Sequence, residues 1–402
     1  MNRKGLAVGD VVELEAERLS YGGDAVAHYE GLAVFIPLAA PGERLRIRIT
    51  ERKKSFARGV IEEIIEPSPE RREAPCAYFG RCGGCQLQHL SYPAQLAAKS
   101  AFVSDALKRI GKIDWTREVE VRSSEEFGYR TRAQVKSERV ANPSEGSGVR
   151  IGFHRAGSHS VIDVESCPIL TPELNSALSS IRAGASASVP GEIELAAGDG
   201  EVGSAPLIPQ GPAETVARKI GGETYTFGPS TFFQGNRFLL EELVDEAVGE
   251  ESGRLAVDLY AGVGLFTIRL ARAFERVIGV ESDPQASSFA RANLSENGVA
   301  NVEFHNDRAE GWLRGFVTKI VGGEETPDLV VLDPPRAGAA EAIEHLIDAR
   351  PARISYVSCD PATLARDLRK LLDSGYEMKS VKAFDLFPQT YHVETVARLR
   401  RI

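Results

Sequence analysis

The last third of the chain alternates short apolar runs with segments of helical pattern, and this alternation constrains the fold more than any other feature. Five apolar runs lie between residues 254 and 358, and helical patterns occur at residues 265–274, 284–297 and 361–372. Apolar strands joined by helices are typical of a parallel sheet covered on both faces. We therefore expect an α/β domain that ends in two antiparallel strands, at residues 378–384 and 393–399, because no helix separates them.

The first part of the chain has a different pattern. Residues 8–66 alternate apolar and polar residues in short steps between Gly and Pro turns, which predicts a small antiparallel β-barrel. Every second residue of the run R-L-R-I-R-I is an arginine, so these side chains should share one face of a strand. That face suits a phosphate backbone, and a solvated charged edge explains it equally well. The candidate RNA-binding residues here are Arg44, Arg46, Arg48, Lys53 and Lys54.

Length and composition predict a multidomain protein. The 402 residues suffice for two or three domains, and a Pro-rich linker at residues 66–69 separates the barrel from the rest of the chain. We expect domains at residues 1–68, 69–235 and 236–402, the middle one mainly β apart from a helix at residues 93–110.

No apolar run approaches the roughly 20 residues that span a bilayer, so we expect a cytoplasmic protein without a membrane partner. A formal charge of −9 argues against nucleic acid, except where basic residues gather locally.

The five cysteines fall into two groups with different chemistry. Cys76, Cys82 and Cys85 form a C-x5-C-x2-C pattern, with Cys167 downstream, while Cys359 stands alone in S-C-D-P. In a reducing compartment such a pattern indicates a metal site before it indicates a disulfide. Four thiolates suit either zinc or an iron–sulfur cluster, and the residues alone leave both open.

The turn after the first strand of the α/β domain predicts a cofactor site. Gly262 and Gly264 of D-L-Y-A-G-V-G let the backbone turn tightly and approach a ligand. Glu281 ends the second strand, where a carboxylate binds ribose hydroxyls, and Asp307 closes the third, where it could accept from an adenine amino group. The third glycine of the dinucleotide fingerprint is missing. Acidic strand ends without that glycine favour S-adenosylmethionine over NAD.

Three residues near the ends of later strands are candidates for the chemistry. Asp333 of D-P-P-R and Cys359 should both face the cofactor crevice. Cys359 precedes a Pro-started helix whose N-terminus should lower the pKa of its thiol, which favours a nucleophile over a buried packing thiol. Glu394, beside His392 in H-V-E-T, is either a surface carboxylate or a partly buried base with a raised pKa.

Taken in order, these motifs resemble the RNA uracil-5-methyltransferases that make 5-methyluridine, in their TRAM-domain iron–sulfur form. The likeness covers nearly the whole chain and includes F-F-Q-G-N at residues 232–236. It implies an OB-like TRAM barrel, a central 4Fe-4S domain and a Rossmann-like class I S-adenosylmethionine-dependent methyltransferase domain. The cluster ligands it implies are Cys76, Cys82, Cys85 and Cys167. Residues implied to contact the cofactor or the target base are Gln234, Tyr260, Glu281, Asp307 and Asp333, with Phe232 stacking on RNA.

The resemblance also implies a mechanism. Cys359 would add to C6 of uracil so that C5, otherwise a poor nucleophile, takes the methyl group of S-adenosylmethionine. Glu394 would then remove the C5 proton, and Asp333 would hold the base by a hydrogen bond. Where many relatives have Cys and Asn or Thr flanking the two glycines, this chain has Ala261 and Leu265, so contacts from those positions are not expected.

Alternatives remain open at this point. The barrel and the cysteines favour 23S ribosomal RNA as the substrate, with transfer RNA as the second choice and no obligate protein partner. An adenine amino-methyltransferase would use the D-P-P motif, but Arg336 stands where an aromatic residue would stack the base. A non-catalytic RNA-binding iron–sulfur protein is the remaining class.

Overall fold

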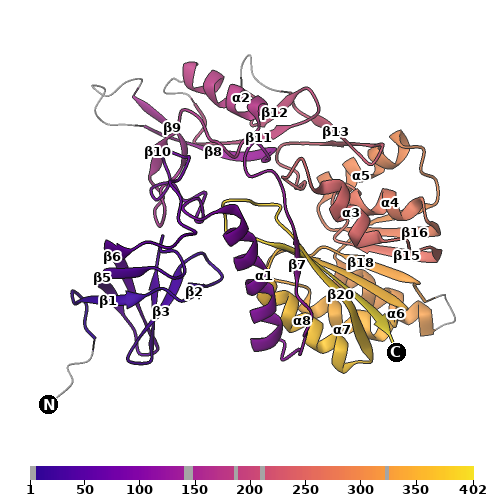
Figure 1. The fold of residues 1–402 in the computed structure, drawn as a ribbon. Coiled ribbons are helices and arrows are strands. Elements are labelled where there is room, and N and C mark those ends of the chain that lie inside the picture. The colour runs from indigo at the N-terminus through magenta and orange to yellow at the C-terminus, as the bar shows by residue number, and fades with distance from the viewer. Residues whose placement is uncertain (1–5, 140–147, 185–188, 209–212, 322–325) are drawn as a thin grey trace.

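The computed structural model describes residues 6–139, 148–184, 189–208, 213–321 and 326–402. Three parts follow one another along the chain: an N-terminal barrel, a middle region of small sheets, and a C-terminal layered α/β region (Figure 1). Among the described residues, no helix is long and apolar enough to cross a membrane.

The N-terminal part is the predicted small barrel. Its six strands follow the order β1-β5-β6-β4-β3-β2, and every pair is antiparallel except β4 with β6. Burial alternates along β5 as the sequence predicts, with the arginines outward and Leu45, Ile47 and Ile49 inward. The strands are β1 Val11–Glu15, β2 Arg18–Leu19, β3 Ala25–Tyr29, β4 Leu32–Ile36, β5 Arg44–Arg52 and β6 Phe56–Glu66.

The middle region is mainly β, as predicted. An antiparallel sheet of order β10-β9-β8-β11-β12 packs against one helix, and a two-stranded hairpin, β13 with β14, comes after it. Asn142 to Gly146, a polar stretch whose sequence predicts a turn, lie outside the described residues. The elements are β8 Arg132–Arg139, β9 Val149–His154, β10 Val161–Asp163, α2 Pro172–Ala183, β11 Glu192–Ala197, β12 Val202–Ala205, β13 Val216–Ile220 and β14 Glu223–Phe227.

The C-terminal part is the expected sheet with helices on both faces. Its order is β17-β16-β15-β18-β19-β21-β20-β7, and the strands are parallel from β17 to β19. The last two predicted strands do pair antiparallel. The strands are β15 Gly253–Leu259, β16 Phe274–Glu281, β17 Val302–Asn306, β18 Leu329–Leu332, β19 Arg353–Ser358, β20 Tyr376–Phe384 and β21 Glu394–Arg401.

Two apolar cores lie on the two faces of this sheet. One contains residues of α1, α6, α7 and α8, and the other contains residues of α3, α4 and α5. Prolines in the first turn and aspartate caps start α5 and α8 abruptly, directly after a strand end. The helices are α1 Tyr92–Arg109, α3 Leu240–Val248, α4 Leu265–Ala271, α5 Pro284–Glu296, α6 Ala309–Val321, α7 Ala340–Ala349 and α8 Pro361–Asp373.

Two early elements join the C-terminal sheet, which the sequence did not indicate. β7, Glu120–Arg122, extends the sheet as its edge strand and runs parallel to β20. α1 packs on α8 and lies between the barrel and the sheet (Figure 1). The boundaries at residues 68 and 235 stay predictions, and the chain before residue 235 contributes directly to the layer that carries the site.

Candidate active site

One large cavity opens at the carboxyl edge of the parallel strands. Its volume is about 810 Å³, and it lies where the strand order reverses between β15 and β18, the usual ligand position in open α/β sheets. It brings together residues from five strand ends and from the F-F-Q-G-N segment. The predicted site residues that line it are Phe232, Gln234, Tyr260, Gly262, Glu281, Asp333, Cys359 and Glu394.

The glycine turn forms one wall of this cavity. Tyr260 and Gly262 have φ angles of 63° and 55°, and nothing lies within 4 Å of where a Cβ of Gly262 would stand. Glycine is favoured at position 262 because L side chains rarely adopt positive φ, although Tyr260 does so in the same turn. The Gly262 N–H donates to Glu281 Oε2 at 2.9 Å, so the carboxylate at the end of β16 holds the turn. Tyr260 donates its hydroxyl to Glu310 Oε1 at 3.0 Å.

Two predicted cofactor residues do not line the cavity. Gly264, with φ 92°, is the N-cap of α4 and serves the turn itself. Asp307 follows β17 and is exposed; its Oδ1 accepts from the N–H of Arg308 at 2.7 Å. The neighbours Arg308 and Glu310 line the cavity instead. The position of Asp307 directly after a strand predicts that it lies near the site. It does not predict the direction of its side chain.

Asp258, at the end of β15 just below the glycine turn, is a buried acid that sequence reasoning did not single out. Desolvation raises the pKa of its carboxyl to about 7, although the Thr267 hydroxyl donates to Oδ2 at 2.5 Å. Its Oδ1 has no hydrogen-bond partner. Asp258 opens the D-L-Y-A-G-V-G motif, so its place was visible in the sequence and its burial was not.

Cys359 faces this cavity, but the expected lowering of its thiol pKa is wrong. Burial and the nearby carboxylates of Glu394 and Asp333 raise the pKa to about 12, and Arg336 opposes them. The positive end of α8 is already used, because Asp360 accepts from the N–H groups of Ala362 and Thr363, both at 2.9 Å. The thiol therefore starts protonated and needs a base close by.

Two carboxyls stand beside that thiol, Asp333 half-buried and Glu394 buried. Desolvation raises the pKa of Asp333 to about 7, and Gln234 Nε2 donates to its Oδ2 at 3.3 Å. Glu394 begins β21 and is only 2 % exposed, and burial together with Asp333 raises the pKa of its carboxyl well above the usual range. Of the two alternatives for Glu394, the buried carboxyl with a raised pKa is confirmed, and its role as a base stays a prediction. None of the described residues hydrogen-bonds its Oε1, which is open to accept a proton.

The cavity also contains His392, which was not among the predicted site residues. Burial and the neighbouring Arg336 lower the pKa of the imidazole to about 4, so it is neutral at pH 7. Its Nε2 lies 3.5 Å from Nη2 of Arg336. The H-V-E-T motif contained the signal, since His392 lies only two residues before Glu394.

The rim of the cavity is aromatic. Phe232 is 68 % exposed although it lines the cavity, while its neighbour Phe233 is buried and stacks on Phe227 with ring centroids 4.2 Å apart. Tyr21, from the barrel, reaches the catalytic region and donates its hydroxyl to the carbonyl oxygen of Cys359 at 3.2 Å. The barrel thus touches the loop that carries the candidate nucleophile.

The other four cysteines meet in a second cavity in the middle region. Cys76, Cys82, Cys85 and Cys167 all line a pocket of about 40 Å³, together with Arg130 and apolar side chains. Burial raises the pKa of Cys85 to about 12 and of Cys167 to about 11, while the charge of Arg130 opposes the shift in both. All four thiols are free. The gathering of residues separated by 82 positions was expected from the sequence alone.

The donor set of this second cavity fits a metal group. Four cysteines converge, shielded by Phe79, Phe153 and Leu170, and four thiolates are the ligands of both structural zinc and iron–sulfur clusters. Among the described residues, no three His, Cys, Asp or Glu side chains form a group that could hold a metal ion as they stand. The cluster expected from the resemblance is therefore a proposal.

The basic face of the barrel is less positive than its sequence suggests. Arg44 lies 3.0 Å from Glu13 and 3.1 Å from Glu66, and Arg46 lies 2.9 Å from Glu13. Arg48 pairs with Glu62, and Lys53 lies 3.1 Å from Glu51. Lys54 is exposed at the turn before β6. These acidic partners favour, for part of the face, the alternative interpretation of the arginine run as a solvated charged edge.

Comparisons with known proteins agree with this geometry. The family model described as tRNA (Uracil-5-)-methyltransferase matches residues 219–402, and the TRAM domain model matches residues 6–61. The crystal structure of the Pyrococcus abyssi tRNA (uracil-54, C5)-methyltransferase in complex with S-adenosyl-L-homocysteine superposes with a TM-score of 0.72 at 27% identity. It covers 96% of this chain and 100% of that one.

Curated relatives extend over the whole chain. The 23S rRNA (uracil(1939)-C(5))-methyltransferase of Salmonella typhimurium is 34% identical, covering 98% of this chain and 96% of its own length. An uncharacterized RNA methyltransferase of Aquifex aeolicus is 33% identical, covering 96% of this chain and 98% of its own length. Identity of this extent, with a TRAM barrel before a methyltransferase fold, shows that the chain belongs to the family of RNA (uracil-5-)-methyltransferases.

Proposed function

We propose that this protein transfers a methyl group from S-adenosylmethionine to C5 of a uridine in 23S ribosomal RNA. The observation that carries the proposal is the single cavity that joins Cys359, Glu394 and Asp333 to the glycine turn. A nucleophile, a base and a cofactor-binding turn in one cavity are what C5 methylation of uracil requires. The ribosomal substrate rests on the names of relatives such as the Salmonella enzyme.

Cofactor binding falls to the wall formed by Tyr260, Gly262 and Glu281. The carboxylate of Glu281 suits ribose hydroxyls, and Gly262 lets the ligand approach the backbone. Gln234 lines the same cavity and donates a hydrogen bond to Asp333, one of the reacting residues. S-adenosylmethionine, when bound there, supplies the electrophilic methyl group. The S-adenosyl-L-homocysteine bound by the Pyrococcus structure supports the same ligand class.

The first chemical step is the addition of Cys359 to the uracil ring. The carboxylate of Asp333, beside the thiol, takes the thiol proton, and the new S–C6 bond forms as the C5=C6 electrons move toward O4. Asp333 has a raised pKa, so it donates a hydrogen bond to the base in its protonated form. The enolate carbon C5 then takes the methyl group, and its bond to the sulfonium breaks.

The second step restores the aromatic base. Glu394, ionised and with Oε1 unpartnered, removes the proton from C5. The electrons of that C–H bond reform C5=C6 and expel the Cys359 thiolate. The thiolate takes its proton back from Asp333 and Glu394 releases the C5 proton to solvent, so the site regenerates without an external reductant. The neutral ring of His392 and the guanidinium of Arg336 lie on the same wall and enclose the base.

RNA reaches this half-buried thiol only if the target base leaves its stack. The exposed ring of Phe232 at the rim offers a surface on which a base or its neighbour can stack. The exposed Lys54 and the ion-paired arginines of β5 would follow the backbone, exchanging carboxylates for phosphates.

The four-cysteine cavity is proposed to hold a 4Fe-4S cluster with a structural role. The four converging thiols and their apolar shield support a buried group held by Cys76, Cys82, Cys85 and Cys167. Iron and acid-labile sulfide analysis of protein purified without oxygen should give about four of each per chain. Stoichiometric zinc without iron would overturn the cluster.

The proposed reaction is tested with RNA that carries 5-fluorouridine. Fluorine at C5 cannot be removed as a proton, so the protein should accumulate a covalent, methylated complex with the RNA that survives denaturing electrophoresis. Cys359→Ala should form none. Tight RNA binding without methyl transfer to any RNA would instead indicate a non-catalytic RNA-binding protein.

A transfer RNA substrate is the second candidate, favoured by the superposition on the Pyrococcus transfer RNA enzyme along nearly the whole chain. Incubation of the protein with labelled S-adenosylmethionine and either purified 23S rRNA or bulk transfer RNA separates the two. Label in 5-methyluridine of 23S rRNA alone supports the ribosomal substrate, and label in transfer RNA alone contradicts it.

A further inference from the structure

A nine-residue connection between β20 and β21 closes one side of the active-site cavity. Phe384, the last residue of β20, pairs with Glu394, the first of β21, so residues 385–393 form the loop of this hairpin. We call residues 385–393 the hairpin loop. Phe387 and His392 of this loop line the cavity, and Glu394 comes directly after it. Any shift of the hairpin loop therefore moves groups that surround Cys359.

The hairpin loop is held almost entirely by segments that precede residue 237. Asp385 forms an ion pair with Lys99 of α1, and both side chains are 0% exposed. The carbonyl oxygens of three successive residues then accept from three different buried side chains. Leu386 accepts from Asn236 at 3.0 Å, Phe387 from Lys99 at 3.0 Å and Pro388 from the Tyr129 hydroxyl at 2.9 Å.

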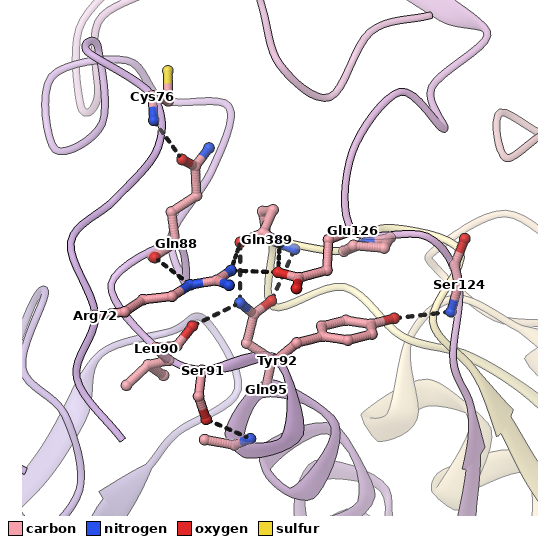
Figure 2. A network of polar contacts seen from close by, with 12 residues as sticks. Arg72, Cys76, Gln88, Leu90, Ser91, Tyr92, Gln95, Ser124, Glu126 and Gln389 are labelled. Carbon is pink, nitrogen blue, oxygen red and sulfur yellow. Dashed lines mark hydrogen bonds and ion pairs between the residues drawn. The ribbon is translucent and has the colours of Figure 1, made fainter. Parts of the chain in front are cut away.

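Gln389 is the most heavily bonded residue of the hairpin loop. It is 0% exposed and has φ 70°, a conformation that costs free energy unless its surroundings enforce it. Its N–H donates to Gln95 Oε1 at 3.0 Å, and its side-chain amide accepts from Arg72 at 3.2 Å and donates to Glu126 at 3.0 Å (Figure 2). Every polar atom of a strained, buried residue is thus paired.

The carbonyl oxygen of Gln389 is bonded to the cysteine segment, residues 76–89. Its carbonyl oxygen accepts from the N–H groups of Gln86 at 3.0 Å and Leu87 at 2.9 Å, the two residues directly after Cys85. Arg72 also donates to the carbonyl of Gln88, whose side chain accepts from the Cys76 N–H at 3.2 Å (Figure 2). The segment that carries three of the four cysteines therefore holds the hairpin loop by hydrogen bonds.

We infer that Gln389 is a positioning residue, through which the cysteine segment 76–89 sets the placement of Phe387 and His392 around the target base. The inference rests on the proposed function, in which these side chains surround the uracil that Cys359 attacks. The cofactor wall of Gly262 and Glu281 lies in the turn after β15 and at the end of β16, and within the described part of the chain Gln389 makes no hydrogen bond to it. Loosening the loop should slow base capture and leave cofactor binding intact.

Gln389→Ala tests this inference because alanine keeps the same backbone strain and removes only the side-chain bonds. We expect the rate of adduct formation with 5-fluorouridine RNA to fall about tenfold or more, since small misplacements of reacting groups have effects of this size. The affinity for S-adenosylmethionine, measured by calorimetry, should stay within about twofold of wild type, because the substitution leaves the cofactor wall in place. Tyr129→Phe, which removes one hydroxyl from Pro388, should act in the same direction.

The matched control is Gln134→Ala, which removes an exposed glutamine of β8 that donates to Glu192. This variant should change neither the rate of adduct formation nor the affinity for S-adenosylmethionine. An adduct rate unchanged in Gln389→Ala, or a loss of cofactor affinity as large as the loss of rate, would overturn the inference. A wild-type protein that forms no adduct would contradict the proposed function instead, so the two failures are distinguishable.

Hydrogen exchange tests the link to the cysteine segment without any activity measurement. Gln88→Ala removes the side chain that accepts from Cys76 and does not touch Gln389. The amides of residues 385–393 should exchange faster in this variant, as they should in Gln389→Ala. Faster exchange confined to residues 76–89, with the hairpin loop unchanged, would show that the cysteine segment does not set the loop.

Discussion

The two thiol sites of this protein are alike in burial and opposite in their surroundings. Burial raises the pKa of Cys359 and of Cys85 to about 12. Cys359 faces the carboxyls of Glu394 and Asp333, which accept protons. Cys85 faces the other thiols Cys82 and Cys167, with Arg130 as the nearby positive charge.

This difference separates two uses of the same functional group. A thiol beside carboxyls can lose its proton for one step and regain it later, which suits reversible addition to a base. Thiols that face one another lose their protons together only when a metal replaces them, because several thiolates would repel one another. The surroundings, rather than the acidity of the thiol, thus distinguish the proposed catalytic site from the proposed metal site.

Removal of the catalytic thiol should have the largest effect. Cys359→Ala takes away the only group that activates C5, so methylation should fall by at least about 10³-fold. Metal content and S-adenosylmethionine affinity should match wild type, because neither site uses this sulfur. A rate of methyl transfer close to wild type, measured with labelled cofactor, would contradict the catalytic role proposed for Cys359.

Replacement of the base should block the end of the reaction. Glu394→Gln cannot take the C5 proton, so turnover should fall by roughly 10²-fold or more. The methylated RNA should stay attached to Cys359, and denaturing electrophoresis should show this complex with ordinary uridine RNA. If Glu394→Gln instead turned over freely, another group such as Asp333 would be the base.

Turnover should rise with pH between about 6 and 8, by up to tenfold per unit, because both reacting groups work deprotonated. The sign follows from the shifts: the carboxyl pKa of Glu394 is raised, so a low pH protonates the base, and the raised pKa of Cys359 leaves less thiolate at low pH. Rapid-quench rates measure this dependence. A rate that fell with rising pH would show that a protonated acid, not a base, limits the reaction.

Cys85→Ser should act mainly on structure. Loss of one of four ligands should reduce the metal content and lower the unfolding midpoint by roughly 5 °C or more. The adduct rate with 5-fluorouridine RNA should stay within about tenfold of wild type, since Cys359 and its carboxyls remain. A loss as complete as that of Cys359→Ala would mean that the second thiol site takes part in the chemistry.

Most of this arrangement could be predicted from the sequence because it depends on local order. Alternating runs locate strand ends, and strand ends of a parallel sheet meet at one edge, so Cys359 and Asp333 were expected to face one crevice. Asp307 also follows a strand of this sheet, but it does not line the cavity, because the direction of a side chain after a strand depends on the turn that comes next. The helix effect on Cys359 failed because the cap residue Asp360 occupies the same amides.

Long-range docking could not be predicted. Nothing near Gln389 in the sequence indicates that Arg72 and Gln86 lie against it, more than 300 residues away. The same holds for β7, whose three residues join the edge of a sheet built from the far end of the chain. Such contacts depend on how whole elements pack, and periodicity within one element does not encode them.

Tyr21 offers the smallest and most specific test of how the catalytic thiol is held. Its ring contacts Phe102 and Tyr391 edge to face, with centroids 5.8 and 5.3 Å away, and its hydroxyl donates to the Cys359 carbonyl. Tyr21→Phe keeps both ring contacts and removes one hydrogen bond, so the adduct rate should fall about three- to tenfold, as expected for a bond worth about 1 kcal/mol. The metal content and the rates of cysteine-segment exchange should not change. An equal change at both thiol sites would show that the barrel supports the fold as a whole, whereas an effect at Cys359 alone makes the barrel a part of the active site.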